Sequence, residues 1–314
     1  MVSWVLPTMV AAAVCAGSTE PGASVEGVFD SNGVKIRYVT AGEGQPVVLI
    51  HGWMADSGMW GRDASGKTAL STAGAEGLRF IALDCRGHGQ SDKPHDPAQY
   101  GPEMAADVVR LMDHLKIDAA HLVGYSSGAY IAGIVAAKHP ERVRSLVFAG
   151  QGPLISRGAQ DGAPEEKPAD ARPSEVEVFA KAVEEGKGMG AYILAVTPPD
   201  RPKPTKEQAD ALANWMLRGK DLKALAAAGL SFKHMGVPVE QLRRCGAPIL
   251  FMHGEREGEA VKSAVASARA LLGRGEVKVV PGGDHMTTLV KPEFRAWLLE
   301  FLRSAKGETK AGGV

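Results

Sequence analysis

The sequence predicts an α/β protein with a mostly parallel central sheet, helices on both faces and a helical lid insertion. Three observations predict it: short apolar runs recur along the chain, helical patterns separate them, and the alternation breaks once, between residues 153 and 240. Strands that are apolar throughout indicate a sheet buried on both faces, which favours parallel pairing. Strand and helix in repeated alternation give a layered α/β architecture.

The predicted strands begin with one alternating run and continue as buried ones. Val34 to Val39 alternates apolar and polar residues, as a half-exposed strand does. Helical patterns cover Met104 to Leu115, with apolar residues on one side, and Gly128 to His139, which Pro140 ends. The apolar strand runs are residues 47–50, 80–83, 121–123, 146–148, 249–252 and 277–280.

The interruption of this alternation predicts a separate helical layer. Residues 156–173 are rich in Gly, Ala, Pro and charge and are expected to form a mobile loop. Ser174 to Glu177 and Thr205 to Gln208 each match the capping box, so a helix is predicted to begin at each, with a proline-rich spacer between them. The predicted organisation is an N-terminal segment at 1–24, a core at 25–152 and 241–303, a lid at 153–240 and a flexible tail at 304–314.

Composition and charge limit the partners. Hydrophobic residues make up 45% of the 314 residues and charged residues 23%, which is ordinary for a globular protein. Lys plus Arg and Asp plus Glu both total 36, so no cationic surplus is available to neutralise phosphates, and we expect no nucleic-acid partner. The expected partner is a small-molecule substrate, and the sequence indicates no particular oligomeric state.

The three cysteines, Cys15, Cys85 and Cys245, are isolated from one another and from histidine clusters. This spacing predicts neither a zinc site nor a disulfide framework, and we expect no metal and no cofactor. Two buried thiols are the preferred interpretation of Cys85 and Cys245, with a single bridge between them as the alternative.

The N-terminal segment carries a short apolar run. Met9 to Val14 is shorter than the roughly 20 residues that a bilayer-spanning helix needs, so we expect no stable membrane span. Val14-Cys15-Ala16 resembles a signal-peptidase site, which predicts export. No Lys or Arg precedes the run, so an uncleaved extension on a cytoplasmic protein is the alternative.

The strongest chemical signal is Gly124-Tyr125-Ser126-Ser127-Gly128, between a predicted strand and a predicted helix. A nucleophile on so sharp a turn has strained dihedral angles, and small residues are needed two positions to either side. Such a turn would lift the Ser126 hydroxyl clear of the sheet and aim the Ser127 amide at an oxyanion. The alternative is a structural Gly/Ser turn.

Together with further motifs in the expected order, the chain resembles the α/β-hydrolase superfamily over about residues 25–303. These motifs are His51-Gly52-Trp53, the turn Asp84-Cys85-Arg86-Gly87-His88-Gly89-Gln90-Ser91, the segment His139-Pro140-Glu141-Arg142-Val143, and Gly283-Asp284-His285. The resemblance implies the α/β-hydrolase fold and a serine-nucleophile, esterase-like activity. Ser126 in place of an aspartate argues against epoxide hydrolases and haloalkane dehalogenases, which attack with a carboxylate.

Chemistry requires a base beside the serine, because an unassisted hydroxyl is a poor nucleophile near neutral pH. Of the nine histidines, only His285 follows the last strand in a glycine-rich loop at the carboxyl edge of the sheet. We therefore predict that His285 is the general base, with an ordinary loop histidine as the alternative. His51 belongs to the predicted oxyanion loop, and His253 is expected to order the loop after its strand.

The carboxylate expected to orient His285 departs from the family pattern. The family usually carries His-Gly-x-x-Asp, whereas this chain reads His253-Gly254-Glu255-Arg256-Glu257, so Glu257 stands at the aspartate position. Glutamate can orient an imidazole through the same hydrogen bond. Glu255, Glu259 and the absence of a functional acid are the alternatives. The family's other acid position, after the sixth strand, holds the uncharged Gln151.

The resemblance also places the second oxyanion donor at the main-chain amide of Trp53. The Trp53 ring is then expected to line the substrate pocket or to face the lid, and Tyr125 is expected to face the pocket. Asp84 and Arg86 are interpreted as a structural pair that holds their turn. Apolar residues of the insertion either line an acyl cavity or pack between lid helices: Met189, Tyr192, Trp215, Met216, Phe232 and Met235.

The predicted function is cleavage of an ester-type bond in a small, mostly uncharged hydrophobic substrate. Ser126 would form the acyl-enzyme, His285 would act as base and then acid, and Glu257 would orient the imidazole. A carbon–carbon bond hydrolase or a cofactor-free perhydrolase on the same triad is an alternative. A hydrolase-like binding protein without turnover is another, supported only by the altered acid position.

Overall fold

The computed structural model describes residues 24–61, 77–156, 174–186, 188–197 and 202–305. The predicted mobile loop, N-terminal segment and C-terminal tail lie almost wholly outside these residues, as does half of the proline-rich spacer. In the described part, no helix is long and apolar enough to cross a bilayer.

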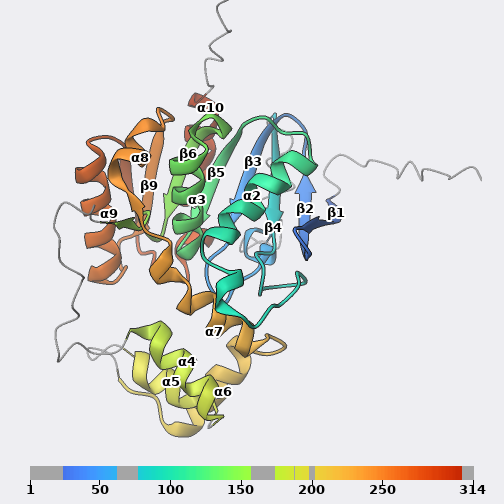
Figure 1. The fold of residues 1–314 in the computed structure, drawn as a ribbon. Helices are drawn as coiled ribbons and strands as arrows, with labels where there is room; N and C mark the ends of the chain where they lie inside the picture. Colours follow the sequence, from blue (N-terminus) through green and yellow to red (C-terminus); the bar gives the residue numbers. More distant parts are fainter. Residues whose placement is uncertain (1–23, 62–76, 157–173, 187, 198–201, 306–314) are drawn as a thin grey trace, which may run out of the picture.

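Within the described residues, eight strands form one sheet in the order β1-β2-β4-β3-β5-β6-β9-β10 (Figure 1). β2 pairs antiparallel with β1 and β4, and the other pairs are parallel. The strands are β1 (Val25–Ser31), β2 (Val34–Ala41), β3 (Gln45–Ile50), β4 (Leu78–Leu83), β5 (Ala120–Tyr125), β6 (Val143–Ala149), β9 (Ile249–Gly254) and β10 (Glu276–Val280). Every predicted strand is confirmed.

Helices cover both faces of the sheet, as predicted (Figure 1). Side chains of α2, α3, α8 and α9 share one apolar core with the strands, whereas α10 and the 3-10 helix η1 close the other. These helices are α2 (Pro102–His114), α3 (Ser127–Lys138), α8 (Val239–Arg244), α9 (Glu259–Leu272), α10 (Pro292–Ser304) and η1 (Ser57–Trp60). α3 is apolar around its whole circumference, since it lies deep in the structure between sheet and neighbouring helices.

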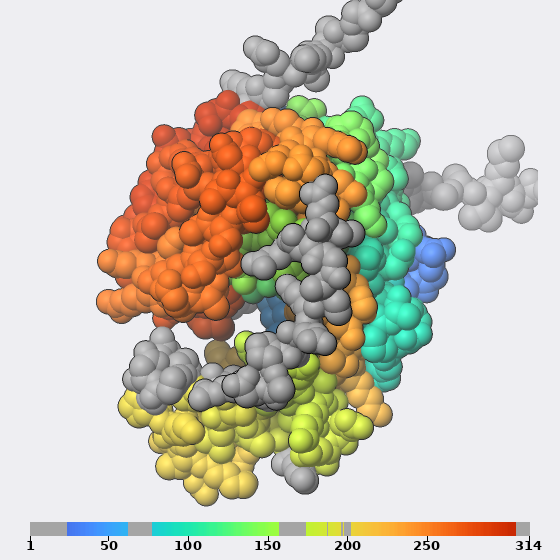
Figure 2. All heavy atoms as spheres, turned by 60° about the vertical axis from the view of Figure 1, so that its left-hand side comes forward, coloured from blue at the N-terminus to red at the C-terminus, as the bar shows by residue number. Residues whose placement is uncertain are grey.

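A helical layer lies between β6 and β9 in the chain. It consists of α4 (Glu175–Glu185), α5 (Gly190–Val196), α6 (Lys206–Met216) and α7 (Leu222–Leu230). The capping boxes at Ser174 and Thr205 are both formed, so the two predicted helix starts are confirmed. α4, α5 and α6 lie below the sheet with α7 closest to it (Figure 1), and a hollow separates this layer from the α9 side of the core (Figure 2).

The insertion has its own apolar centre, which includes Phe179, Tyr192 and Leu225. Its two ends are joined where β7 (Ile155–Ser156) pairs with β8 (Val237–Pro238). This short ladder fixes the points at which the chain leaves and re-enters the core. The helices are therefore held at the edge of the sheet where β3 and β5 end.

Cys85 and Cys245 are buried free thiols, so the alternative of a bridge between them is wrong. Burial raises the pKa of both thiols. A buried, protonated thiol behaves as a small apolar side chain. Both cysteines belong to the packing of the core that contains α2 and α3.

Candidate active site

Ser126 occupies a strained turn between β5 and α3. Its dihedral angles are φ 54° and ψ −122°, a region that side chains other than glycine rarely adopt. The main-chain amide of Ser126 donates to the carbonyl of Ala149 at 2.8 Å, which ties the turn to β6. Such strain persists only where the surrounding structure enforces it, and it is typical of functional sites.

The two glycines of the turn are required by close packing. A Cβ on Gly124 would lie 2.3 Å from the carbonyl oxygen of Gly128, and a Cβ on Gly128 would lie 2.2 Å from that of Ile50. Both distances are far below any tolerable contact. The sequence Gly-x-Ser-x-Gly thus lets α3 start directly against β3 and β5, which presents Ser126 at the end of its strand.

His285 lies beside Ser126, although 159 residues separate them in sequence. The Nε2 atom of His285 is 3.0 Å from the Oγ atom of Ser126, a hydrogen-bonding distance. Both residues are partly exposed, so a substrate can approach them. The loop after β10 therefore brings the predicted base to the predicted nucleophile.

Glu257 completes a chain of three side chains. Both of its carboxylate oxygens are 3.2 Å from Nδ1 of His285. A carboxylate can only accept here, so Nδ1 carries the proton and Nε2 presents a lone pair to the Ser126 hydroxyl. This is the tautomer that general-base chemistry at serine requires.

The alternative acids face elsewhere. Glu255 accepts a hydrogen bond at 2.8 Å from the main-chain amide of Gly282, and it is exposed. Glu259 is exposed in the first turn of α9. The side-chain oxygen of Gln151 accepts from the amide of Gly152. Of these candidates, Glu257 is the one whose carboxylate contacts His285.

The His285 loop is held by its own hydrogen bonds. Oδ1 of Asp284 accepts from the amides of Met286 and Thr287 at 3.0 and 2.9 Å. The backbones of the acid loop and the histidine loop touch, because a Cβ on Gly254 would lie 2.3 Å from the carbonyl oxygen of Gly283. This contact fixes the position of Glu257 relative to His285.

Tyr125 does not face a pocket as expected. Its side chain is only 3% exposed, and its hydroxyl donates to the main-chain carbonyl of His285 at 2.6 Å. Burial raises the pKa of this hydroxyl and keeps it protonated as a donor. Tyr125 therefore supports the histidine loop from beneath.

The predicted oxyanion loop lies against the serine. A Cβ on Gly52 would be 3.0 Å from Cβ of Ser126, so only glycine fits here without displacement. Trp53 follows directly in the chain. Ser127 is the first residue of α3, where main-chain amides have no partner within the helix. The two predicted amide donors thus lie on segments that border the Ser126 side chain.

The Trp53 ring faces the insertion, an orientation that is compatible with the predicted role in the pocket. Its indole nitrogen donates to the carbonyl of Leu225 in α7 at 2.9 Å. The ring also packs edge-on against Phe179 of α4 and Phe232, at 5.0 and 5.9 Å between centroids. Trp53 therefore links the oxyanion loop to the helical layer.

Two buried histidines brace the loop from behind. Nε2 of His51 accepts from the amide of Cys85 at 2.9 Å, so Nδ1 carries the proton and donates to the carbonyl of Gly52 at 2.8 Å. His88 lies 5.1 Å away between ring centroids. Burial lowers the pKa of His51 and lowers that of His88 to about 3, so both rings are neutral.

The predicted pairing of Asp84 with Arg86 is wrong. Arg86 makes a two-pronged contact with Asp107 of α2, at 2.7 and 2.6 Å. Asp84 instead accepts from the amides of Ser57 and Gln90, both at 2.8 Å. Asp84 and Arg86 do both hold the turn. Apart from Gln90, however, their partners lie outside the local sequence motif.

The insertion residues considered for an acyl cavity mostly pack among themselves. Met189, Tyr192 and Met216 belong to the apolar centre of the insertion. Met235 is buried in the main core with Phe232 against it, and Trp215 is 75% exposed. Helix packing is therefore the interpretation that their positions favour.

Comparisons with known proteins bear on the fold family of this chain. The family profile described as alpha/beta hydrolase fold matches residues 45–292. The chain is 32% identical to an epoxide hydrolase of Caballeronia sordidicola over 171 residues, 54% of this chain but only 45% of that relative. It is 30% identical over 295 residues to a non-heme chloroperoxidase of Streptomyces lividans, 88% of this chain and 99% of the relative.

Among solved structures, a carboxylesterase of the thaumarchaeon Nitrososphaera gargenis superposes with a TM-score of 0.68. It is 21% identical and covers 90% of this chain and 98% of its own. At this identity the likeness shows the fold. The family match spans most of the chain and includes the turn at Ser126 and the loop at His285, and the chain therefore belongs to the α/β hydrolase fold family.

Proposed function

We propose that this chain is a serine hydrolase that cleaves an ester-type bond in a small, mostly uncharged hydrophobic substrate. The single observation that carries the proposal is the hydrogen-bonded series Ser126–His285–Glu257 at the end of β5. A serine hydroxyl with a neutral imidazole on one side and a buried carboxylate behind the imidazole is an activated nucleophile.

The proposed reaction uses only groups of this chain and the substrate. Oγ of Ser126 attacks the carbonyl carbon while Nε2 of His285 takes its proton, and Glu257 stabilises the imidazolium that forms. The carbonyl oxygen becomes an oxyanion and accepts from the amides of Trp53 and Ser127. His285 then gives its proton to the leaving alcohol, and the acyl group remains on Ser126.

Hydrolysis of this acyl-enzyme repeats the steps with water. His285 removes a proton from water, hydroxide adds to the acyl carbon, and the proton returns to Oγ of Ser126 as the acid leaves. The partly exposed side of His285 lets water enter. In this proposal the helical layer α4–α7 acts as a lid that borders the acyl group, since Trp53 of the oxyanion loop is bonded to it.

The similarity to an epoxide hydrolase supports a shared fold more strongly than a shared reaction. Opening an epoxide through an alkyl-enzyme ester requires a carboxylate nucleophile, and this chain has Ser126 at that place. The match also spans less than half of that relative. We therefore favour acyl transfer over epoxide opening.

A second candidate is cofactor-free perhydrolysis on the same three residues. It is favoured by the match to a non-heme chloroperoxidase over almost the whole of both chains. Hydrogen peroxide in place of water would attack the acyl-enzyme and release a peracid, which is able to oxidise halide ions. The first half of the reaction is identical, so the two candidates differ only in the acceptor.

Hydrolysis of p-nitrophenyl esters of graded acyl length tests the proposal. Wild type is expected to turn over a short or medium ester, and Ser126→Ala should lower kcat/KM at least about a thousandfold with unchanged thermal unfolding. Ser263→Ala, an exposed serine on α9, is the matched control and should retain full activity. Peroxide added to the same assay distinguishes perhydrolysis, and near-full activity of Ser126→Ala would overturn the assignment.

A further inference from the structure

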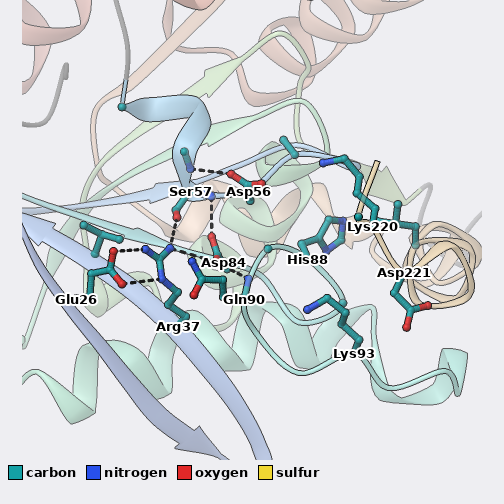
Figure 3. Close-up of a pocket in the computed structure, with 18 of the residues that line it drawn as sticks. Glu26, Arg37, Asp56, Ser57, Asp84, His88, Gln90, Lys93, Lys220 and Asp221 are labelled. Atoms are coloured by element: carbon teal, nitrogen blue, oxygen red, sulfur yellow. Dashed lines mark hydrogen bonds and ion pairs between the residues drawn. The ribbon is translucent and has the colours of Figure 1, made fainter. Parts of the chain in front are cut away.

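A cavity lies beside the predicted oxyanion loop. It has a volume of about 510 Å³, within the range of small-molecule sites. Its walls come from β1 and β2, the start of η1, the turn after β4, and the loop between α6 and α7 (Figure 3). Ser126, His285 and Glu257 do not line it, so it is distinct from the proposed active site.

The carboxylates in the wall of this cavity are already engaged. Arg37 binds Glu26 at 2.6 Å and Asp84 at 3.3 Å (Figure 3). Asp56 accepts from a main-chain amide at the start of η1, and Asp221 does so at the start of α7. Arg37 therefore offsets part of this negative charge, and the main-chain amides hold the carboxylates of Asp56 and Asp221 in place.

Three other cations in the lining have no such ion pair within the described part of the chain. Among the described residues, no carboxylate lies within ion-pair distance of Lys93, Arg218 or Lys220, all of which line the cavity. Nζ of Lys93 donates to a main-chain carbonyl, that of Ser91, at 2.8 Å. Figure 3 shows the side chains of Lys93 and Lys220 directed into the cavity from opposite sides of His88.

We propose that this cavity binds a small oxyanion with more than one negative charge, such as a phosphate or a di- or tricarboxylate. The ammonium groups of Lys93 and Lys220 and the guanidinium of Arg218, all in the lining, can supply charge-assisted hydrogen bonds to such a group. The neutral imidazole of His88 closes the back of the site without adding or removing charge. The site lies at a junction, because Lys93 belongs to the core and Lys220 to the insertion.

The bound anion would contact both supports of the oxyanion loop. Ala55 and Asp56 in the cavity wall follow Trp53 in the chain. Lys220 precedes α7, whose Leu225 carbonyl holds the Trp53 indole. Burial, with a smaller contribution from the Lys220 charge, lowers the pKa of His51, so the field of this lysine already reaches the histidine that braces the loop.

Titration calorimetry with inorganic phosphate and with citrate, at constant ionic strength set by sodium chloride, tests the proposal. Wild type should bind at least one of them saturably, and the double variant Lys93→Ala/Lys220→Ala should bind it at least about tenfold more weakly. Lys223→Ala is the matched control, an exposed lysine on α7 outside the cavity, and should match wild type. Preference for phosphate or for citrate identifies the anion class.

The second readout is the thermal midpoint, which a ligand of the native state raises with the logarithm of its concentration once that concentration exceeds Kd. An anion that binds should raise the midpoint of wild type and of Ser126→Ala equally, since binding does not require the proposed nucleophile. Absence of saturable binding to wild type would overturn the proposal, as would equal affinity in the double variant. Neither result bears on ester hydrolysis by Ser126.

Discussion

Glu257 meets His285 with both carboxylate oxygens at 3.2 Å from Nδ1. The Glu257 side chain is 1% exposed, whereas that of His285 is 41% exposed. The negative charge therefore lies on the buried side of the imidazole, where solvent screens it least. The side of the ring that bears Nε2 faces Ser126 and remains open to substrate.

Replacing the carboxylate by an amide should disable the imidazole. In Glu257→Gln the amide can offer its NH2 group to Nδ1 and favour the wrong tautomer, so kcat is expected to fall about a thousandfold or more. Steady-state hydrolysis of a p-nitrophenyl ester measures this. Glu255→Gln is the matched control, because a glutamine oxygen can still accept from Gly282. A larger loss in Glu255→Gln than in Glu257→Gln would move the acid to residue 255.

Tyr125 is expected to act as a positioning residue for His285. Tyr125→Phe keeps the buried ring but removes the hydroxyl that bonds the His285 carbonyl. We predict that kcat falls about three- to tenfold with little change in KM, because a small displacement of the base weakens a transition-state contact. Tyr192→Phe also removes a buried hydroxyl, one bonded to Glu175 in the insertion. It should leave kcat unchanged, and equal losses in both variants would show that Tyr125 acts only through stability.

The close packing at the turn predicts that Gly128 cannot be replaced by a larger residue without a large loss of stability. Gly128→Ala places a methyl group 2.2 Å from the carbonyl oxygen of Ile50, so the free energy of unfolding should drop by more than about 3 kcal/mol, or the chain should fail to fold. Gly246→Ala meets no atom within 4 Å and should change it by less than about 0.5 kcal/mol. Urea denaturation compares the two. Similar stability in both variants would contradict the close approach of α3 to β3.

The buried histidine on β5 predicts a loss of stability in acid. Burial lowers the pKa of His121 from its ordinary value of about 6.5 to about 4, and the ring lies between Ser145 and Gln45. As the pH falls, this imidazole therefore takes up a proton in the unfolded chain at a higher pH than in the folded one. The resulting stability is complete above about pH 6.5 and is lost progressively as the pH falls toward about 4, by roughly 3 kcal/mol in total.

Urea denaturation between about pH 7 and pH 4 checks this, with His121→Asn and the exposed His234→Asn as a matched pair. Over this pH window, His121→Asn should lose less stability than wild type, and most of the roughly 3 kcal/mol loss should be absent. His234→Asn should follow wild type. A His121→Asn variant with the same slope as wild type would show that other groups cause the acid loss.

The parallel strands and the strained turn could be predicted because their signals are local. A short apolar run between two helical patterns is readily recognised as a buried strand, and the two glycines flank Ser126 in the sequence itself. β1 was missed because Gly27 breaks its alternation and Val25 and Val28 face solvent. The turn Asn32-Gly33 could have revealed it, since both residues have positive φ and this pair is typical of a tight hairpin.

The partners of polar and charged side chains could not be predicted in the same way. Arg86 is two residues from Asp84, yet it binds Asp107 because α2 packs over the turn. Tyr125 was expected in the pocket because it adjoins Ser126, but its ring turns inward to the loop of His285. Both cases depend on elements that are distant in sequence and adjacent only after folding.

The most direct test of the proposed chemistry is labelling with a fluorophosphonate, followed by peptide mapping of the folded protein. An activated Ser126 should take up about one phosphonyl group per chain on the peptide that contains it, because the reagent reacts with a serine whose proton a base removes. His285→Ala should abolish the labelling while the thermal midpoint stays close to that of wild type. A folded wild-type protein that remains unlabelled at Ser126, or that is labelled equally in His285→Ala, would contradict the proposed nucleophile and its base.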